Sequence, residues 1–136
     1  MIFKGLEVSV TGMAAQRIRI DISSSNLANV NSTRAEDGQP YRRKVPVFQA
    51  ILDKESGLPL YQVRVARVES DPTPFKMKYD PEHPDAGPDG YVMLPNVDPL
   101  REMVDMMSAI RTYEANLTAF NTHKDMLLKS LELIKV

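Results

Sequence analysis

Residues 80–90 contain four carboxylates and one of the two histidines, which are the residue types best suited to metal binding or acid–base catalysis. Clustered Asp, Glu and His side chains can hold a divalent cation or act as a general acid and base pair. Prolines interrupt the alternate ligand spacing that a calcium-binding EF-hand loop requires. We therefore expect a stiff, solvated turn. The alternative is a metal or hydrolytic site built on four residues: Asp80, Glu82, His83 and Asp85.

Other signatures of catalysis are missing from the sequence. It contains no Gly-X-Ser-X-Gly nucleophile motif, no phosphate-binding glycine loop and no His-Glu-X-X-His pair. The basic run Arg42-Arg43-Lys44 is expected to be the solvated face of a strand. We predict a protein that is not an enzyme and that uses no metal, no other cofactor and no small-molecule substrate.

Composition excludes further classes. The chain has 136 residues and no cysteine, which excludes a disulfide framework and thiolate metal ligands. Its net charge of -1 argues against a nucleic-acid-binding protein, which normally shows a basic excess. No run of apolar residues is long enough for a membrane-spanning helix, so we predict no direct membrane insertion.

The ten prolines all lie between residues 40 and 99, so two proline-free arms flank a proline-punctuated middle. We predict an N-terminal helical arm over residues 1–33, a β-rich insertion over 34–97 and a C-terminal helical arm over 98–136. Within the insertion, alternating apolar side chains predict strands around Val63 and Met77. The expected fold class is α+β, with the two arms forming one helical domain.

The C-terminal arm carries the clearest helical pattern. Asp98-Pro99 is a typical helix start, because Asp caps free amides and Pro suits the first helical position. Apolar side chains then recur at steps of three and four, which is typical of a coiled-coil seam. The predicted seam and assembly residues of this arm are Met103, Met106, Ile110, Tyr113, Leu117, Phe120, Leu127, Leu131 and Ile134.

The N-terminal arm shows the same period less regularly. Gly5 and Gly12 each lower helix propensity by about 1 kcal/mol relative to Ala, so this helix is expected to need a partner. We expect the two arms to pair as a coiled-coil-like hairpin whose remaining apolar surface packs against neighbouring subunits. The predicted assembly residues of this arm are Phe3, Leu6, Val10, Met13, Ile20 and Leu27.

Two strings of residues resemble a known family. The segment SSNLANVNST at residues 24–33 is similar to the asparagine-rich motif in the first helix of the axial proteins of the bacterial flagellum, the rod and hook family. The segment YDPEHPDA at residues 79–86 and the segment PNVD at residues 95–98 resemble one branch of it, the proximal-rod C components of the basal body.

This resemblance implies a structural subunit of the proximal rod. Such a subunit would assemble with copies of itself and with other rod proteins into a helical tube around the export channel. It would leave the cell through the flagellar type III export apparatus, without a cleavable signal peptide, and reside in the rod that crosses the periplasm. The resemblance also favours hydrogen bonds between subunits at four asparagines: Asn26, Asn29, Asn31 and Asn116.

The residue pattern also fits a protein that is not a rod subunit. The two apolar seams would also suit a soluble coiled-coil adaptor or chaperone that forms closed dimers. A closed dimer would show a discrete mass in dilute solution. A free rod subunit is expected to be a monomer with protease-sensitive ends.

Overall fold

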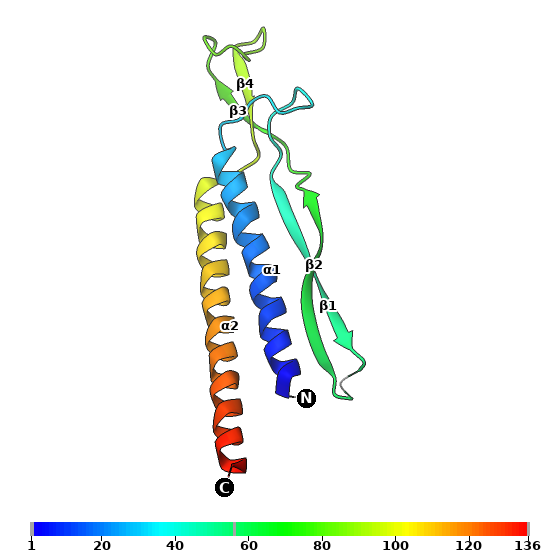
Figure 1. Ribbon diagram of the computed structural model, residues 1–136. Coiled ribbons are helices and arrows are strands. Elements are labelled where there is room, and N and C mark those ends of the chain that lie inside the picture. Colours follow the sequence, from blue (N-terminus) through cyan, green and yellow to red (C-terminus); the bar gives the residue numbers. More distant parts are fainter. Residues whose placement is uncertain (1, 56, 136) are drawn as a thin grey trace.

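The chain folds into two long terminal helices with two β-hairpins between them, one long and one short (Figure 1). The computed structural model describes residues 2–55 and 57–135, and Met1, Ser56 and Val136 lie outside the described residues. The outermost positions of both predicted arms therefore lie outside them as well. The elements in chain order are α1 (Ile2–Ala28), β1 (Lys44–Asp53), β2 (Leu60–Ser70), β3 (Lys76–Tyr79), β4 (Tyr91–Leu94) and α2 (Pro99–Ile134). The predicted α+β class is confirmed.

Helix α2 begins where the sequence predicts. The Asp98 side chain accepts a hydrogen bond from the Leu100 amide at 3.1 Å, and Pro99 occupies the first turn. Proline has no amide hydrogen to leave unpaired there, and its fixed φ suits the helix. The helix then continues for 36 residues, which gives it a length of about 54 Å at 1.5 Å per residue.

Helix α1 lies between α2 on one side and the long hairpin β1–β2 on the other (Figure 1). The helices are antiparallel neighbours, and α2 extends beyond the N-terminus of α1 (Figure 1). Two contacts tie the first half of α1 to the hairpin. Lys4 Nζ lies 3.2 Å from Asp53 Oδ2, and the Val63 amide donates to Thr11 Oγ1 at 3.4 Å. The central position of α1 gives this weak helix a packing partner on both sides.

Both β-sheets are two-stranded and antiparallel. The β1–β2 register shifts between Val47 and Phe48, just after Pro46, because a proline cannot donate to the strand ladder and is confined to edges and bulges. The predicted strand around Val63 lies in β2, and the one around Met77 corresponds to β3. The β3–β4 hairpin lies beyond the start of α2, at the end of the molecule remote from the C-terminus (Figure 1).

The interior of the subunit is small and unusually polar. The buried apolar side chains include Ala15, Val92, Pro95, Val97 and Ala109. Asn26, Arg43 and Glu102 are buried beside them. Because most large apolar residues of both helices keep substantial exposure, apolar burial alone gives this fold a thin core.

Candidate assembly interface

The two helices meet through small and polar side chains. A Cβ atom added to Gly5 would lie 2.5 Å from His123 Nε2, and one added to Gly12 would lie 2.9 Å from Asn116 Nδ2. Both glycines and both partners are seven residues apart, so one antiparallel register serves both contacts. These glycines, which weaken α1 as an isolated helix, allow α2 to approach it closely.

The α2 side of this contact is displaced by one residue from the predicted seam. Glu102 and Ala109 are fully buried, and the same seven-residue spacing continues to Asn116 and His123. The predicted seam instead includes the residues that directly follow these in the sequence, and their side chains stay exposed. In the first half of the helix these residues are Met103, Ile110 and Leu117, with exposed fractions of 51%, 40% and 41%.

The predicted seams therefore separate into two rows on each helix. The inner row is half-buried and consists of Leu6, Met13, Ile20 and Leu27 on α1, and of Met106, Tyr113, Phe120 and Leu127 on α2. The outer row is exposed and includes Phe3 and Val10 on α1, and Met103, Ile110, Leu117 and Leu131 on α2, while Ile134, which continues the inner row, is also exposed. Small and polar residues, rather than the outer row, form the contact between the helices.

Helix periodicity implies that the outer rows of both helices point away from the side where the β1–β2 hairpin lies. The hairpin approaches α1 through Lys4 and Thr11, and Asp105 of α2 is turned toward Arg43 on that same side. Residues three and four apart share a helix face, so the inner and outer rows run side by side away from the hairpin. We call these two rows together the apolar face.

A buried polar cluster joins α2 to the segments that flank the hairpins. The Arg43 Nε donates to Glu102 Oε1, while its Nη1 and Nη2 each lie 3.3 Å from a carboxylate oxygen, of Asp71 and Asp105 respectively. The expectation of a solvated basic face is wrong for Arg43, whose exposed fraction is 8%. Three carboxylates explain its burial, because a buried charge needs partners on every side.

The pKa values in this cluster follow from its contacts. Burial lowers the pKa of Arg43, but the hydrogen bonds and charges of Glu102 and Asp71 together outweigh it and raise that pKa above its ordinary value. Hydrogen bonds from Thr73, followed by the Arg43 guanidinium, lower the pKa of Asp71 below its ordinary value of 3.8. Both groups are therefore held in their charged forms.

Asn26 forms the α1 part of the same cluster. Its Nδ2 donates to the Lys44 carbonyl at 2.9 Å and to Glu102 Oε2 at 3.3 Å. Its Oδ1 accepts from the Lys44 amide at 3.0 Å and from the Tyr41 hydroxyl at 2.8 Å. These four bonds use both donors and both acceptor positions of the amide. Asn26, which the resemblance places between subunits, is therefore saturated inside its own chain.

The other predicted asparagines have different surroundings. Asn29 donates to the Ser25 carbonyl at 2.8 Å and accepts from the Ser32 hydroxyl at 3.1 Å, so it stabilises the end of α1. Asn31 is exposed, and Asn116 lies against Gly12 at the helix contact. Asn26 and Asn29 therefore make hydrogen bonds within their own chain, whereas Asn31 is accessible to other molecules.

Sequence analysis missed Asn96 as a positioning residue. Its Oδ1 accepts from the Arg43 amide at 2.7 Å, and its Nδ2 donates to the carbonyls of Asp71 and Thr73 at 3.1 and 2.9 Å. It thus holds the backbone that presents Arg43 and Asp71. The sequence signal that could have indicated it is the set of apolar residues around it, Val92, Pro95 and Val97, all of which are buried.

The acidic loop at residues 80–90 acts as a structural link. Asp85 accepts hydrogen bonds from Thr33 Oγ1 at 2.7 Å and from the Arg34 guanidinium, and its own amide donates to His83 Nδ1 at 3.0 Å. The Thr33 and Arg34 bonds lower the pKa of Asp85. No cluster of three or more potential metal ligands occurs within the described part of the chain. The loop joins the segment after α1 to the β3–β4 hairpin.

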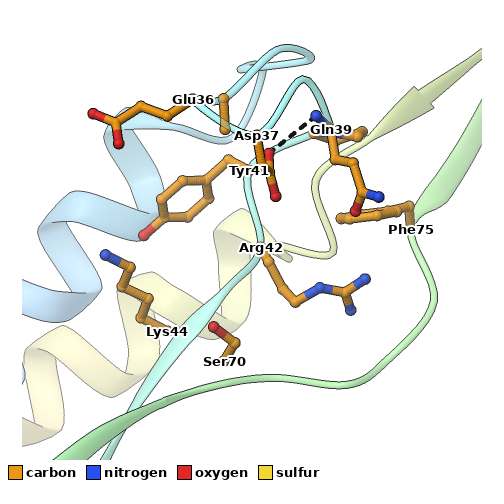
Figure 2. A pocket seen from close by; sticks show the side chains of 10 residues that line it. Glu36, Asp37, Gln39, Tyr41, Arg42, Lys44, Ser70 and Phe75 are labelled. Atoms are coloured by element: carbon orange, nitrogen blue, oxygen red, sulfur yellow. Dashed lines mark hydrogen bonds between the residues drawn. The ribbon is translucent and has the colours of Figure 1, made fainter.

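A hollow of about 510 Å³ lies beside the polar cluster (Figure 2). Arg42 lies across its wall, 4.2 Å from the Phe75 ring centroid, and donates to the carbonyls of Asp71 and Thr73. Figure 2 also shows Asp37, whose carboxylate accepts the Gln39 amide at 3.0 Å in a local turn. These polar groups hold the surrounding loops in place rather than forming a nucleophile with its base.

Comparison with known proteins places these features in a family. Residues 6–35 match the family model described as "Flagella basal body rod protein". Residues 89–133 match the model described as "Flagellar basal body rod FlgEFG protein C-terminal". The first match covers most of α1 and the second covers nearly all of α2. In the described helices, no segment is long and apolar enough to cross a membrane.

Similar proteins extend the match over nearly the whole chain. The flagellar basal-body rod protein FlgC of Bacillus subtilis is 46% identical, with 98% of each chain covered. The FlgC proteins of Aquifex aeolicus and Salmonella typhimurium are 47% and 45% identical, with 98% and 93% of each chain covered. The chain therefore belongs to the FlgC family of flagellar basal-body rod proteins.

Proposed function

We propose that this chain is a structural subunit of the proximal rod, which assembles through its terminal helices into the helical tube around the export channel. Its neighbours are copies of itself and other rod proteins. Helices α1 and α2 act as one coiled-coil-like unit, and the segment between them projects from it. Membership in a family of rod proteins favours this role over the closed dimeric adaptor.

The observation that carries the proposal is the apolar face of the helix pair. Leu117 is 41% exposed and Phe3 is 69% exposed, although both lie on regular apolar rows of long helices. Large contiguous apolar surfaces on soluble proteins usually mark sites of protein association. A face that runs along two parallel helix axes suits lateral packing against similar helices in a tube. Contacts between different faces of identical subunits then continue into a helical array.

Export through the flagellar type III apparatus, without a cleavable signal peptide, completes the proposal. A small core favours such export, because a chain that buries little apolar surface is easily kept unfolded before assembly. The relatives' names place them in the basal body, and we propose that this chain occupies the periplasm-spanning rod.

Replacement of Leu117 by Asp tests this function. We expect Leu117→Asp to lose incorporation into isolated basal bodies and to abolish swimming, because the charge would be buried between subunits. The matched control is Thr122→Asp, an exposed position on another side of α2, which should incorporate normally. Circular dichroism of the purified variants separates assembly from folding. Normal incorporation of Leu117→Asp would overturn the proposal.

A further inference from the structure

Methionine is frequent in this chain and unusually exposed. The sequence contains eight methionines, no cysteine and no tryptophan. Methionine is among the residue types most often buried, yet five of the described methionines keep 46% to 60% of their surface exposed. They are Met77, Met93, Met103, Met107 and Met126. Because no thiol is present to react first, the methionine thioethers are the side chains of this protein most open to oxidation.

The densest group of methionines lies on α2. Met103 and Met107 are four residues apart, so their side chains adjoin on the helix surface. Their exposed fractions are 51% and 57%, whereas Met106 is half-buried in the inner row. Met107 also borders a hollow of about 420 Å³ lined by α2 side chains, which leaves room for a small solute beside it. We call Met103 and Met107 the methionine pair.

The methionine pair belongs to the surface that the proposed function uses and not to the interior. Met103 is part of the outer row of the apolar face, and Met107 adjoins it one turn later. The interior beside this part of α2 is polar instead, because Glu102 is fully buried and bonded to Arg43 and Asn26. A chemical change at the pair therefore alters the apolar face without reaching the contacts that order the subunit.

Oxidation converts methionine from an apolar to a polar side chain. Hydrogen peroxide transfers one oxygen atom to the thioether sulfur, which loses two electrons and becomes a sulfoxide, while the peroxide is reduced to water. On a free subunit, water donates hydrogen bonds to the new oxygen. An apolar contact with a neighbour removes that water and offers no donor in its place. Sulfoxide at the methionine pair therefore disfavours association but not the free, folded subunit.

We propose that the methionine pair is a redox-sensitive modification site, at which oxidation by hydrogen peroxide blocks packing of the apolar face while the subunit stays folded. The change is reversible, since methionine sulfoxide reductases convert both sulfoxide epimers back to methionine. It acts before assembly, when neighbours do not yet cover the face. This inference rests on the proposed function, because it assigns a chemical regulation to the same apolar face.

Mild treatment of the purified full-length chain with hydrogen peroxide tests the site itself. Peptide mass mapping should show oxidation of Met103 and Met107 about three times faster than that of the half-buried Met13 and Met106, because oxidation follows exposure. When the exposed methionines are oxidised, the circular dichroism spectrum and the urea midpoint should be unchanged, since Arg43 and its partners contain no sulfur. Equal oxidation rates at the four positions, or loss of helix on oxidation, would overturn the inference.

Glutamine substitution places a polar side chain of similar length at each position and tests the effect on assembly. We expect the chain with Met103→Gln and Met107→Gln to fold normally and to fall by about tenfold in isolated basal bodies, because both amides would lose their water in the contact. The control Met126→Gln makes the same change at a 60% exposed position that lies in neither row of the apolar face, and it should incorporate normally. Normal incorporation of the doubly substituted chain, loss of its helical spectrum, or an equal loss of incorporation by the control would each refute the site.

Comparison with Leu117→Asp separates this inference from the proposed function. If Leu117→Asp is lost from basal bodies while the doubly substituted chain incorporates normally, the rod function stands and the modification site is refuted. If both variants incorporate normally, the apolar face is not the assembly surface, and both proposals fail.

Discussion

The buried polar cluster and the apolar face occupy different sides of the same two helices and reverse the usual distribution of side chains. The cluster around Arg43 places charged groups inside, with Glu102 fully buried. The apolar face leaves Met103, Ile110 and Leu117 in solvent. The difference teaches that polar contacts set the internal order of this subunit, while large apolar side chains are kept for other molecules.

The cluster is suited to this role because it connects distant segments. Arg43 links the start of β1 to α2 and to Asp71, and Asn26 adds the end of α1. Hydrogen-bonded groups in a buried network admit few alternative arrangements, which favours one register between the helices. Apolar seams with a seven-residue repeat tolerate shifts of register more easily.

Removal of the central cation should give the largest loss of stability. We expect Arg43→Met to lower the free energy of unfolding by about 3–5 kcal/mol, because it leaves Glu102 buried without its cation. The control Arg67→Met removes an exposed ion pair with Glu69 and should cost less than about 1 kcal/mol. Urea denaturation followed by circular dichroism measures both. Similar losses for the two variants would contradict the importance of the cluster.

Enlargement of the helix contact should have the next largest effect. Gly12→Leu forces a side chain against Asn116 and should destabilise the subunit by about 1–3 kcal/mol. The control Ala14→Leu adds the same side chain at an exposed position of α1 and should be nearly neutral. Combination with Asn116→Ala should restore part of the loss, as a double-mutant cycle would detect. Simple additivity would argue against close packing at Gly12.

Acid should weaken the cluster through Asp71. Its folded pKa is lowered, so its contribution to stability is full above the ordinary pKa of 3.8 and disappears as the pH falls through the lower, folded value. We expect the urea midpoint of the natural chain to fall below about pH 4 more steeply than that of Asp71→Asn. Parallel midpoint curves for the two proteins would show that Asp71 does not contribute to the acid response.

Substitution on the apolar face should have the smallest effect on the isolated subunit. Leu117 is exposed, so Leu117→Asp should change the free energy of unfolding by less than about 1 kcal/mol. The same variant is expected to lose incorporation, which sharpens the contrast with Arg43→Met. A loss of stability as large as that of Arg43→Met would mean that the apolar face supports the monomer.

Part of this architecture is predictable from local patterns. Asp98-Pro99 and the apolar period after it are enough to predict α2, because capping and amphipathic spacing are local properties. The strand around Val63 follows from alternation in the same way. The family follows from the strings at residues 24–33 and 79–86, which lie in α1 and its end and in the linking loop.

The partners of buried charges were not predictable. Arg43 and Glu102 are 59 residues apart, and no local pattern states that they meet. The one-residue displacement of the α2 contact was missed because apolar spacing alone favours Met103 over Glu102. A signal was present in the seven-residue repeat of Gly5 and Gly12 opposite that of Asn116 and His123. Small residues at matched spacing on two helices indicate close contact.

The accessibility of the apolar face in the free and the assembled states tests the central claim most directly. A Leu117→Cys chain, otherwise free of cysteine, can be labelled with a maleimide as purified subunit and within isolated basal bodies. We expect rapid labelling of the free subunit, where this position is 41% exposed, and strong protection after assembly. Equal labelling rates in the two states would contradict the claim that this face is covered by neighbouring subunits.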